Sequence, residues 1–148
     1  MKNILEVSLV ILLFGSCKET VDPLLSQSEN VWVFSGYEQL FSLNPQFVPV
    51  QDSLYTYQFE ENGRFMKILG EFELVGSYVV NSELSTHGDT YVLEYDDNSL
   101  DLHQSNTEFP LIHTCFEGVE YMVLEEENTL KGSWGSCDGP TLYFSRGN

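Results

Sequence analysis

Three cysteines carry the most definite chemistry in this chain, and two of them indicate a disulfide. Cys115 lies in the run "LIHTCF" and Cys137 in the loop "GSCDGP". A disulfide between them would stabilise a small extracytoplasmic domain by about 3 kcal/mol. The alternative is two free thiols with a redox role, for which the pair lacks Cys-x-x-Cys spacing. We therefore expect Cys115 and Cys137 to be joined.

The third cysteine, Cys17, follows the features of a secretory signal. Lys2 supplies a positive charge, residues 7–14 are apolar, and the small residues Gly15-Ser16 suit a signal peptidase. The apolar run is too short to span a bilayer, which takes about 20 residues. The sequence therefore predicts a signal peptide over residues 1–16.

The stretch "LFGSC", residues 13–17, resembles a bacterial lipobox, in which the cysteine becomes the lipidated first residue of the mature protein. Phe14 and Glu6 depart from the usual pattern. The resemblance implies that Cys17 is a lipid anchor, that residues 17–28 are a tether, and that the protein is an outer membrane lipoprotein of a bacterial envelope. The tether would hold the domain on the periplasmic face or at the cell surface. An ordinary secretory signal with Cys17 as a spare thiol is the alternative.

Metal and cofactor sites are not indicated by the remaining polar residues. His87, His103 and His113 stand far apart and lack ligand spacing. The stretch from Asp96 to Asp101 lacks the spacing and the glycine of a calcium loop, and a hairpin turn explains it better. In that hairpin Glu94 would oppose Asp101, a repulsive pair that a bound cation or a longer turn would relieve. We expect no cofactor and no resident metal.

The charge and the motifs exclude several classes of function. The chain of 148 residues has 23 acidic and 6 basic residues, a net charge of −17. Nucleic acid is excluded as a partner, because basic residues must neutralise phosphate. Gly-x-Ser-x-Gly, a phosphate-binding glycine loop and the histidine pairs of metallohydrolases are all absent from the sequence. We therefore expect a non-enzymatic protein.

Short apolar runs between Gly, Asn and Asp residues predict an all-β domain over residues 29–148. We expect about nine or ten strands. The expected strands lie near residues 32–37, 53–61, 64–69, 71–80, 90–95, 100–102, 111–116, 120–125, 129–134 and 141–145.

The clearest element is the hairpin "SLYTYQFEENGRFMKIL", residues 53–69. Asn62-Gly63 is the preferred pair of a two-residue type I′ turn. Counting outward, this turn places Phe59 opposite Met66 and Tyr57 opposite Ile68. The hairpin would then have one apolar face and leave Lys67 on the other.

Many sequential strands favour closure into a small antiparallel up-and-down barrel, because closure removes exposed edges. Gly76, within the run "EFELVGSYVV", is suited to a bend that lets the sheet curl. A β-sandwich is the alternative, since alternation alone does not distinguish two stacked sheets from one closed sheet.

The chain resembles the lipocalin-like lipoproteins of Bacteroidota-type bacteria. The matching features are the lipobox, Trp32, "YTYQFEENGRF", "GSYVV", "YVLEYDDNSLDL" and the closing "DGPTLYFSR". Better-known lipocalins begin with Gly-x-Trp and end with an arginine that lies over that tryptophan. By this resemblance Trp32 and Arg146 are candidates for closing the barrel, although Asn30 replaces the glycine. Such a cation–π contact is worth roughly 0.5 to 2 kcal/mol. An exposed terminal arginine is the alternative.

Two functions remain open. In the first, the barrel binds a small apolar or amphipathic ligand. The residues expected to line the cavity are Tyr55, Tyr57, Phe59, Met66, Ile68, Phe72, Leu74, Tyr78, Tyr91, Leu93 and Tyr95.

In the second function, the barrel is filled and the protein acts through its surface, as an interaction or inhibitory module on an envelope partner. The loop over residues 38–51 would then supply the contact, with Phe41 and Phe47 among its apolar side chains. Burial of these phenylalanines against the barrel would favour the first function, and their exposure the second.

Overall fold

A computed structural model describes residues 30–39, 44–86 and 88–147. The expected signal peptide (residues 1–16) and tether (residues 17–28), together with Phe41 and His87, lie outside these residues. The strands are β1 (Val31–Glu38), β2 (Phe47–Pro49), β3 (Tyr55–Phe59), β4 (Arg64–Leu69), β5 (Phe72–Asn81), β6 (Thr90–Tyr95), β7 (Val119–Glu126), β8 (Thr129–Gly132) and β9 (Thr141–Arg146). The helices are α2 (Asp97–Ser105) and the short 3-10 helix η1 (Trp134–Cys137).

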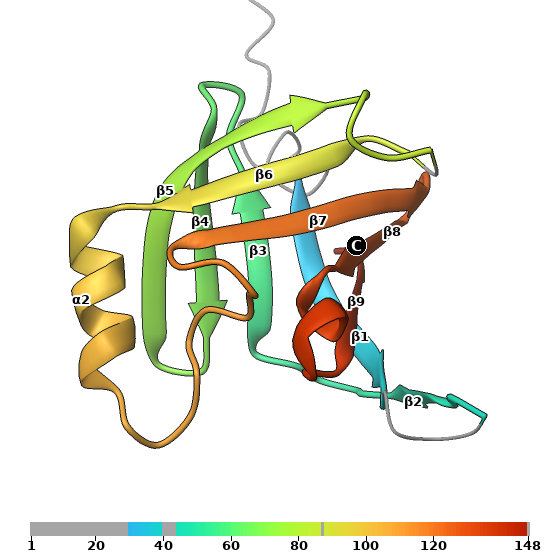
Figure 1. Ribbon diagram of the computed structural model, residues 1–148, viewed down its shortest axis with the longest axis horizontal. Coiled ribbons are helices and arrows are strands. Elements are labelled where there is room, and N and C mark those ends of the chain that lie inside the picture. Colours follow the sequence, from blue (N-terminus) through green and yellow to red (C-terminus); the bar gives the residue numbers. More distant parts are fainter. Residues whose placement is uncertain (1–29, 40–43, 87, 148) are drawn as a thin grey trace, which may run out of the picture.

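The sheet closes into a barrel of eight antiparallel strands. Figure 1 shows how the strands curl around the interior. Each strand from β3 to β8 pairs with the next along the chain, and β3 also pairs with β1. Strand β9 completes the ring by pairing with β1 from Trp32↔Arg146 to Glu38↔Thr141. This closure confirms the all-β barrel and rules out the sandwich. Strand β2 lies outside the ring, paired only with the end of β1.

The barrel core follows from the alternation of side chains along the strands. In β3, Tyr55, Tyr57 and Phe59 are buried and the residues between them are only partly covered. Gly76 on β5 permits close packing, because a Cβ at this position would lie 2.6 Å from the Phe65 ring and 2.1 Å from the carbonyl oxygen of Glu94. The absence of a side chain at Gly76 therefore leaves room for the Phe65 ring to pack against β5.

The register of the β3–β4 hairpin differs from the expected one by one residue. Phe59 pairs with Phe65 and Tyr57 with Lys67. The loop holds three residues, since the Glu60 N–H donates to the Arg64 carbonyl at 2.8 Å and Gly63 adopts a left-handed φ of 80°. The extra loop residue shifts the register of β4 by one residue, which exchanges the side chains that face the interior with those that face outward. Phe65 and Lys67 therefore point inward.

The segment after β6 is a helix and not the expected strand. Asp96 caps α2 by accepting a hydrogen bond from the Ser99 N–H at 2.9 Å. Ser99 is buried and bonds both polar groups of the Val75 backbone, which holds α2 beside β5 (Figure 1). Glu94 instead pairs with Ser77 and Val119, so the expected repulsion with Asp101 does not arise.

The run over residues 111–116 is also not a strand, although an isolated bridge joins Phe116 to Val119. It connects α2 to β7, and its residues Leu111 and Ile112 are buried in the core. The connection therefore helps to fill the barrel.

Candidate functional site

An ion pair lies at the centre of the barrel. Lys67 Nζ on β4 is 2.8 Å from Glu120 Oε1 on β7, and both side chains are almost wholly buried, at 0% and 3% exposure. The two strands are not neighbours in the sheet, so the pair bridges the interior. The pair was not expected from the sequence.

The Glu120 carboxylate also accepts hydrogen bonds from two tyrosine hydroxyls and one backbone N–H. The hydroxyls of Tyr57 and Tyr95 each donate to Oε2 at 2.6 Å, and the His113 backbone N–H donates to Oε1. The Lys67 ammonium lies 5.2 Å from the ring centroids of Tyr55 and Tyr57. A buried charge is tolerated when such hydrogen bonds and ring contacts compensate for its loss of hydration.

A chain of hydrogen bonds extends from this carboxylate to His113. The Tyr55 hydroxyl lies 3.0 Å from the Tyr57 hydroxyl and 2.7 Å from His113 Nδ1. Because Tyr57 donates its single proton to Glu120, a hydrogen bond between the two tyrosine hydroxyls has Tyr55 as its donor. The direction of the bond between Tyr55 and His113 Nδ1 depends on the tautomer of His113.

The pKa values follow from burial and from these partners. Burial alone would raise the pKa of Glu120, but the Lys67 charge, the His113 charge when that ring is protonated, and the hydrogen bonds from Lys67 and Tyr57 outweigh it and lower that pKa. Burial lowers the pKa of Lys67, against the effect of Glu120. Burial and the Lys67 charge lower the pKa of His113 to about 3. At neutral pH the interior therefore holds a Lys67–Glu120 pair and an uncharged His113.

The residues expected to line a cavity divide into three groups. Tyr55, Tyr57, Phe59, Leu74, Leu93 and Tyr95 are buried inside the barrel and belong to its core cluster. Phe72, Tyr78 and Tyr91 are partly buried and pack against that core. Met66 and Ile68 lie on the opposite face of β4 from Phe65 and Lys67, so their expected inward placement is wrong, as the shifted register requires.

The expected structural pairs are brought together. The Sγ atoms of Cys115 and Cys137 lie at a disulfide distance of 2.08 Å. The Arg146 guanidinium lies over the buried Trp32 ring, 5.0 Å from its centroid, where the first and last strands meet. The first pair joins the 111–116 connection to η1, and the second lies where β1 and β9 pair to close the ring.

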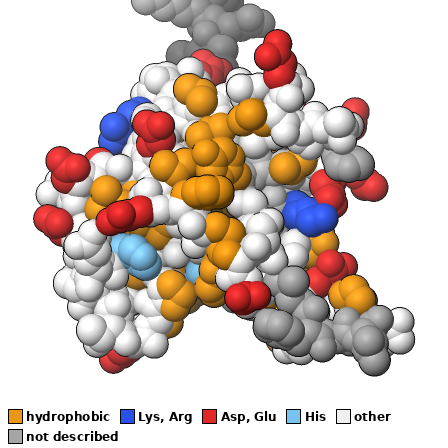
Figure 2. Space-filling view, viewed as in Figure 1, with side chains coloured by type: hydrophobic (Ala, Val, Ile, Leu, Met, Phe, Trp, Pro, Cys, Tyr) orange, Lys and Arg blue, Asp and Glu red, His pale blue; other side chains and the backbone are white. Residues whose placement is uncertain are grey.

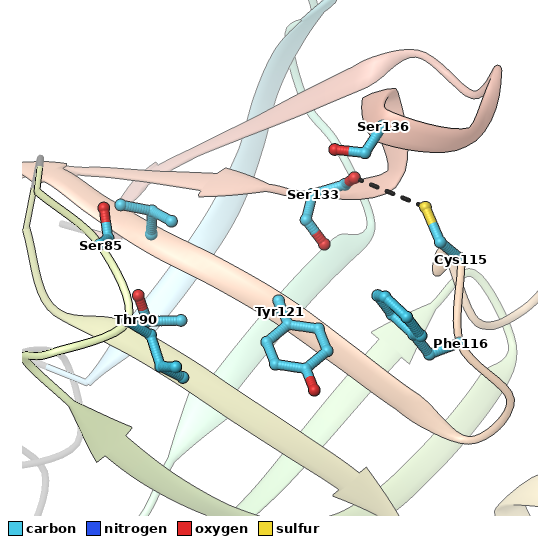
Figure 3. A pocket seen from close by; sticks show the side chains of 9 residues that line it. Ser85, Thr90, Cys115, Phe116, Tyr121, Ser133 and Ser136 are labelled. Carbon is cyan, nitrogen blue, oxygen red and sulfur yellow. Dashed lines mark hydrogen bonds between the residues drawn. The ribbon is translucent and has the colours of Figure 1, made fainter.

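A groove on the outside of the barrel is the second candidate site (Figure 3). Because Glu120 and Met122 point inward, the alternate residues Tyr121 and Val123 of β7 form the outer wall. The hollow has a volume of about 380 Å³. Its lining residues are Leu84, Ser85, Thr90, Cys115, Phe116, Tyr121, Val123, Ser133 and Ser136.

A second hollow of about 280 Å³ continues the first one toward β8 and β9. The two hollows share Ser85, Val123, Ser133 and Ser136, and we call them together the outer groove. The second hollow also contains Lys131, whose Nζ is 2.7 Å from Glu125 Oε1. Hydrophobic side chains gather on this face of the molecule, with acidic side chains around them (Figure 2).

The comparisons with known proteins add no assignment: no family model, curated protein or solved structure matches this chain. Within residues 30–39, 44–86 and 88–147, no helix is long and apolar enough to cross a membrane. In the same ranges, no three His, Cys, Asp or Glu side chains gather in a way that could hold a metal ion.

Proposed function

We propose that this protein is a non-enzymatic, lipocalin-like lipoprotein of a bacterial envelope, anchored through Cys17, whose filled barrel is a rigid scaffold and whose recognition takes place on its outer surface. The observation that carries the proposal is the Lys67–Glu120 pair with its tyrosine donors. These groups occupy the space that an interior ligand would need.

Packing around the pair supports the same conclusion. The Phe144 ring lies 4.9 Å from Tyr55 and 5.0 Å from Tyr57, measured between ring centroids, in edge-to-face contacts. Leu111 and Ile112 enter the core from the connection between α2 and β7. A ligand in this space would have to displace several side chains and break hydrogen bonds to a buried carboxylate, which is costly.

The surface supplies the apolar side chains that recognition requires. Phe47, expected to be either a buried plug or an exposed contact, is 47% exposed on β2. Phe116 and Leu84 are 59% and 58% exposed at the rim of the outer groove. Binding of an apolar or amphipathic small molecule inside the barrel is the less supported function, because the expected lining residues contact one another.

Native mass spectrometry of the mature protein, purified from its own envelope and measured before and after organic extraction, tests this proposal. We expect the mass of the disulfide-bonded, anchored polypeptide with no further component held inside the barrel. A retained small molecule whose removal shifts the NMR signals of Tyr57, Leu93 or Met122 would contradict it, because these residues lie in the interior.

A further inference from the structure

We infer that the outer groove binds an uncharged amphiphile, a molecule with an apolar ring or acyl chain and a hydroxylated head. The inference rests on the proposed function, because it places the ligand on the outside of a filled barrel. It assigns the apolar part to the side chains of Phe116, Leu84 and Tyr121, and the head to the region of Ser133, Ser136 and Lys131.

The apolar end of the outer groove has the size and lining of a small-molecule site. A volume of about 380 Å³ falls within the range of roughly 300 to 1,000 Å³ typical of ligand pockets. The Phe116 ring stands edge-on to Tyr121, with centroids 5.5 Å apart, while most of Phe116 faces solvent. A ligand that covers Phe116 and Leu84 would remove this apolar surface from water, which is favourable.

The walls of the outer groove are held in fixed positions. Tyr121 and Val123 stand on β7, which is paired with strands on both sides. The disulfide from Cys115 to Cys137 joins the segment that carries Phe116 to η1, which carries Ser136. A preformed site binds with less loss of conformational entropy than one that must be ordered by its ligand.

The other end of the outer groove is lined by polar side chains. Its two charged residues, Lys131 and Glu125, form an ion pair, so together they add no net charge. Lys131 pairs with Glu125 at 2.7 Å, and its ammonium also lies 5.6 Å from the Tyr143 ring centroid. The serines and Thr141 add hydroxyl groups that can donate and accept hydrogen bonds. Since the whole chain carries a net charge of −17, an anionic head would be repelled, and a cationic head would lie beside the Lys131 ammonium. A hydroxylated, uncharged head fits best.

The experiment compares three amphiphiles that share one chain and differ in the head. Octyl glucoside, octyl sulfate and octyltrimethylammonium are each titrated below micelle formation into the disulfide-bonded full chain. Binding is followed residue by residue through NMR chemical shifts. We expect octyl glucoside to shift the signals of Phe116, Tyr121 and Val123 at lower concentration than either charged analogue does.

Variants locate the site on the surface. Phe116→Ser should weaken octyl glucoside binding by about tenfold or more, since every 1.4 kcal/mol of lost contact corresponds to tenfold. Phe109→Ser is the matched control, because Phe109 is 42% exposed and packs edge-on to Phe72 at a different hollow. The control should leave the affinity within about twofold.

The outcomes separate this inference from the proposed function. Equal or tighter binding of octyl sulfate or of octyltrimethylammonium at the groove would overturn the assignment of an uncharged head. An absence of shifts at the groove with all three probes would overturn the groove as a ligand site, while the filled barrel would stand. Shifts at Tyr57, Leu93 and Met122 would overturn both, because they would place the amphiphile inside the barrel.

Discussion

Lys67 Nζ lies 2.8 Å from Glu120 Oε1 in the middle of the barrel, where neither side chain reaches solvent. The pair joins β4 to β7 across the interior, and Tyr57 and Tyr95 saturate the second carboxylate oxygen. Such a pair contributes little net stability by itself, but removal of one partner leaves an uncompensated buried charge. The stability of the barrel should therefore be most sensitive to substitutions that remove one charge of this pair and leave the other.

Substitution of Lys67 by methionine tests this sensitivity. Lys67→Met should lower the free energy of unfolding by about 3 to 5 kcal/mol, because Glu120 would stay buried without its cation. The double variant Lys67→Met with Glu120→Gln should recover part of the loss, since glutamine carries no charge and its oxygen still accepts from Tyr57 and Tyr95, although its NH2 group cannot accept from the His113 N–H. Urea denaturation followed by circular dichroism measures the free energy of unfolding of the single and the double variant.

The surface pair of Lys131 and Glu125 provides the control. Its side chains are 35% and 34% exposed, so Lys131→Met should change the free energy of unfolding by no more than about 1 kcal/mol. Equal effects of Lys67→Met and Lys131→Met would show that the interior pair is not held in a dry environment.

His113 makes stability depend on pH. Its pKa is about 3 in the folded protein, against a usual value of 6.5, so the unfolded chain binds more protons between these two values. Stability should therefore fall as the pH falls through this window, by about 2 kcal/mol between pH 7 and pH 5. The contribution of Glu120, whose folded pKa is also lowered, is lost at lower pH than this range.

Two histidine variants separate this effect from the rest of the protein. His113→Gln should flatten the dependence of unfolding free energy on pH between 7 and 5, whereas His103→Gln on α2 should keep most of it. An unchanged slope in His113→Gln would mean that His113 is readily protonated in the folded state.

Much of the barrel could be predicted from the sequence, because half-buried strands impose a period of two. The run "YTYQF" alternates as β3 does in the structure, with Tyr55, Tyr57 and Phe59 inside. The closure of β1 on β9 follows from the number of sequential strands and brings Trp32 to Arg146. These features depend on local pattern and on the general need to remove sheet edges.

The interior polar site could not be predicted, because it depends on one residue of register. Asn62-Gly63 suits a two-residue turn and equally a three-residue loop in which Gly63 is left-handed. The choice decides whether Lys67 or Met66 points inward. A lysine within the otherwise apolar run "FMKIL" was the available signal, but its partner Glu120 comes from a distant strand.

Helix α2 was missed for a local reason. Leu100 and Leu102 are two residues apart, which imitates a strand, and the run "YDDNS" is rich in turn residues. The competing signal was Asp96 as an N-cap, since aspartate is favoured there and accepts from the N–H three residues later.

Gly76 should tolerate no side chain. A Cβ there would lie 2.1 Å from the Glu94 carbonyl oxygen and 2.6 Å from the Phe65 ring, so Gly76→Ala should lower the free energy of unfolding by about 1 to 3 kcal/mol. Gly132→Ala on β8 is the control, because its nearest neighbour would be 3.7 Å away. Chemical denaturation of both variants measures the difference, and equal effects would contradict the close packing at Gly76.

Arg146 should stabilise the pairing of β1 with β9 through its contact with Trp32. Arg146→Ala should cost about 1 kcal/mol, because the guanidinium lies over the ring and its Nε donates to the Glu127 carbonyl at 3.1 Å. Arg64→Ala at the exposed hairpin should cost less than about 0.5 kcal/mol. Thermal unfolding compares them, and an unchanged melting temperature in Arg146→Ala would show that the contact is not stabilising.

The disulfide should stabilise the fold as a whole. It should also hold residues 111–116 in place against the core. Its removal in the Cys115→Ser, Cys137→Ser double variant should lower the free energy of unfolding by about 3 kcal/mol, since the bond restricts the unfolded chain. The amides near His113 should also exchange with solvent faster, because this segment would lose its link to η1. Cys17→Ser is the control and should change neither quantity. Equal amide protection at His113 with and without the disulfide would show that Leu111 and Ile112 hold the segment by burial alone.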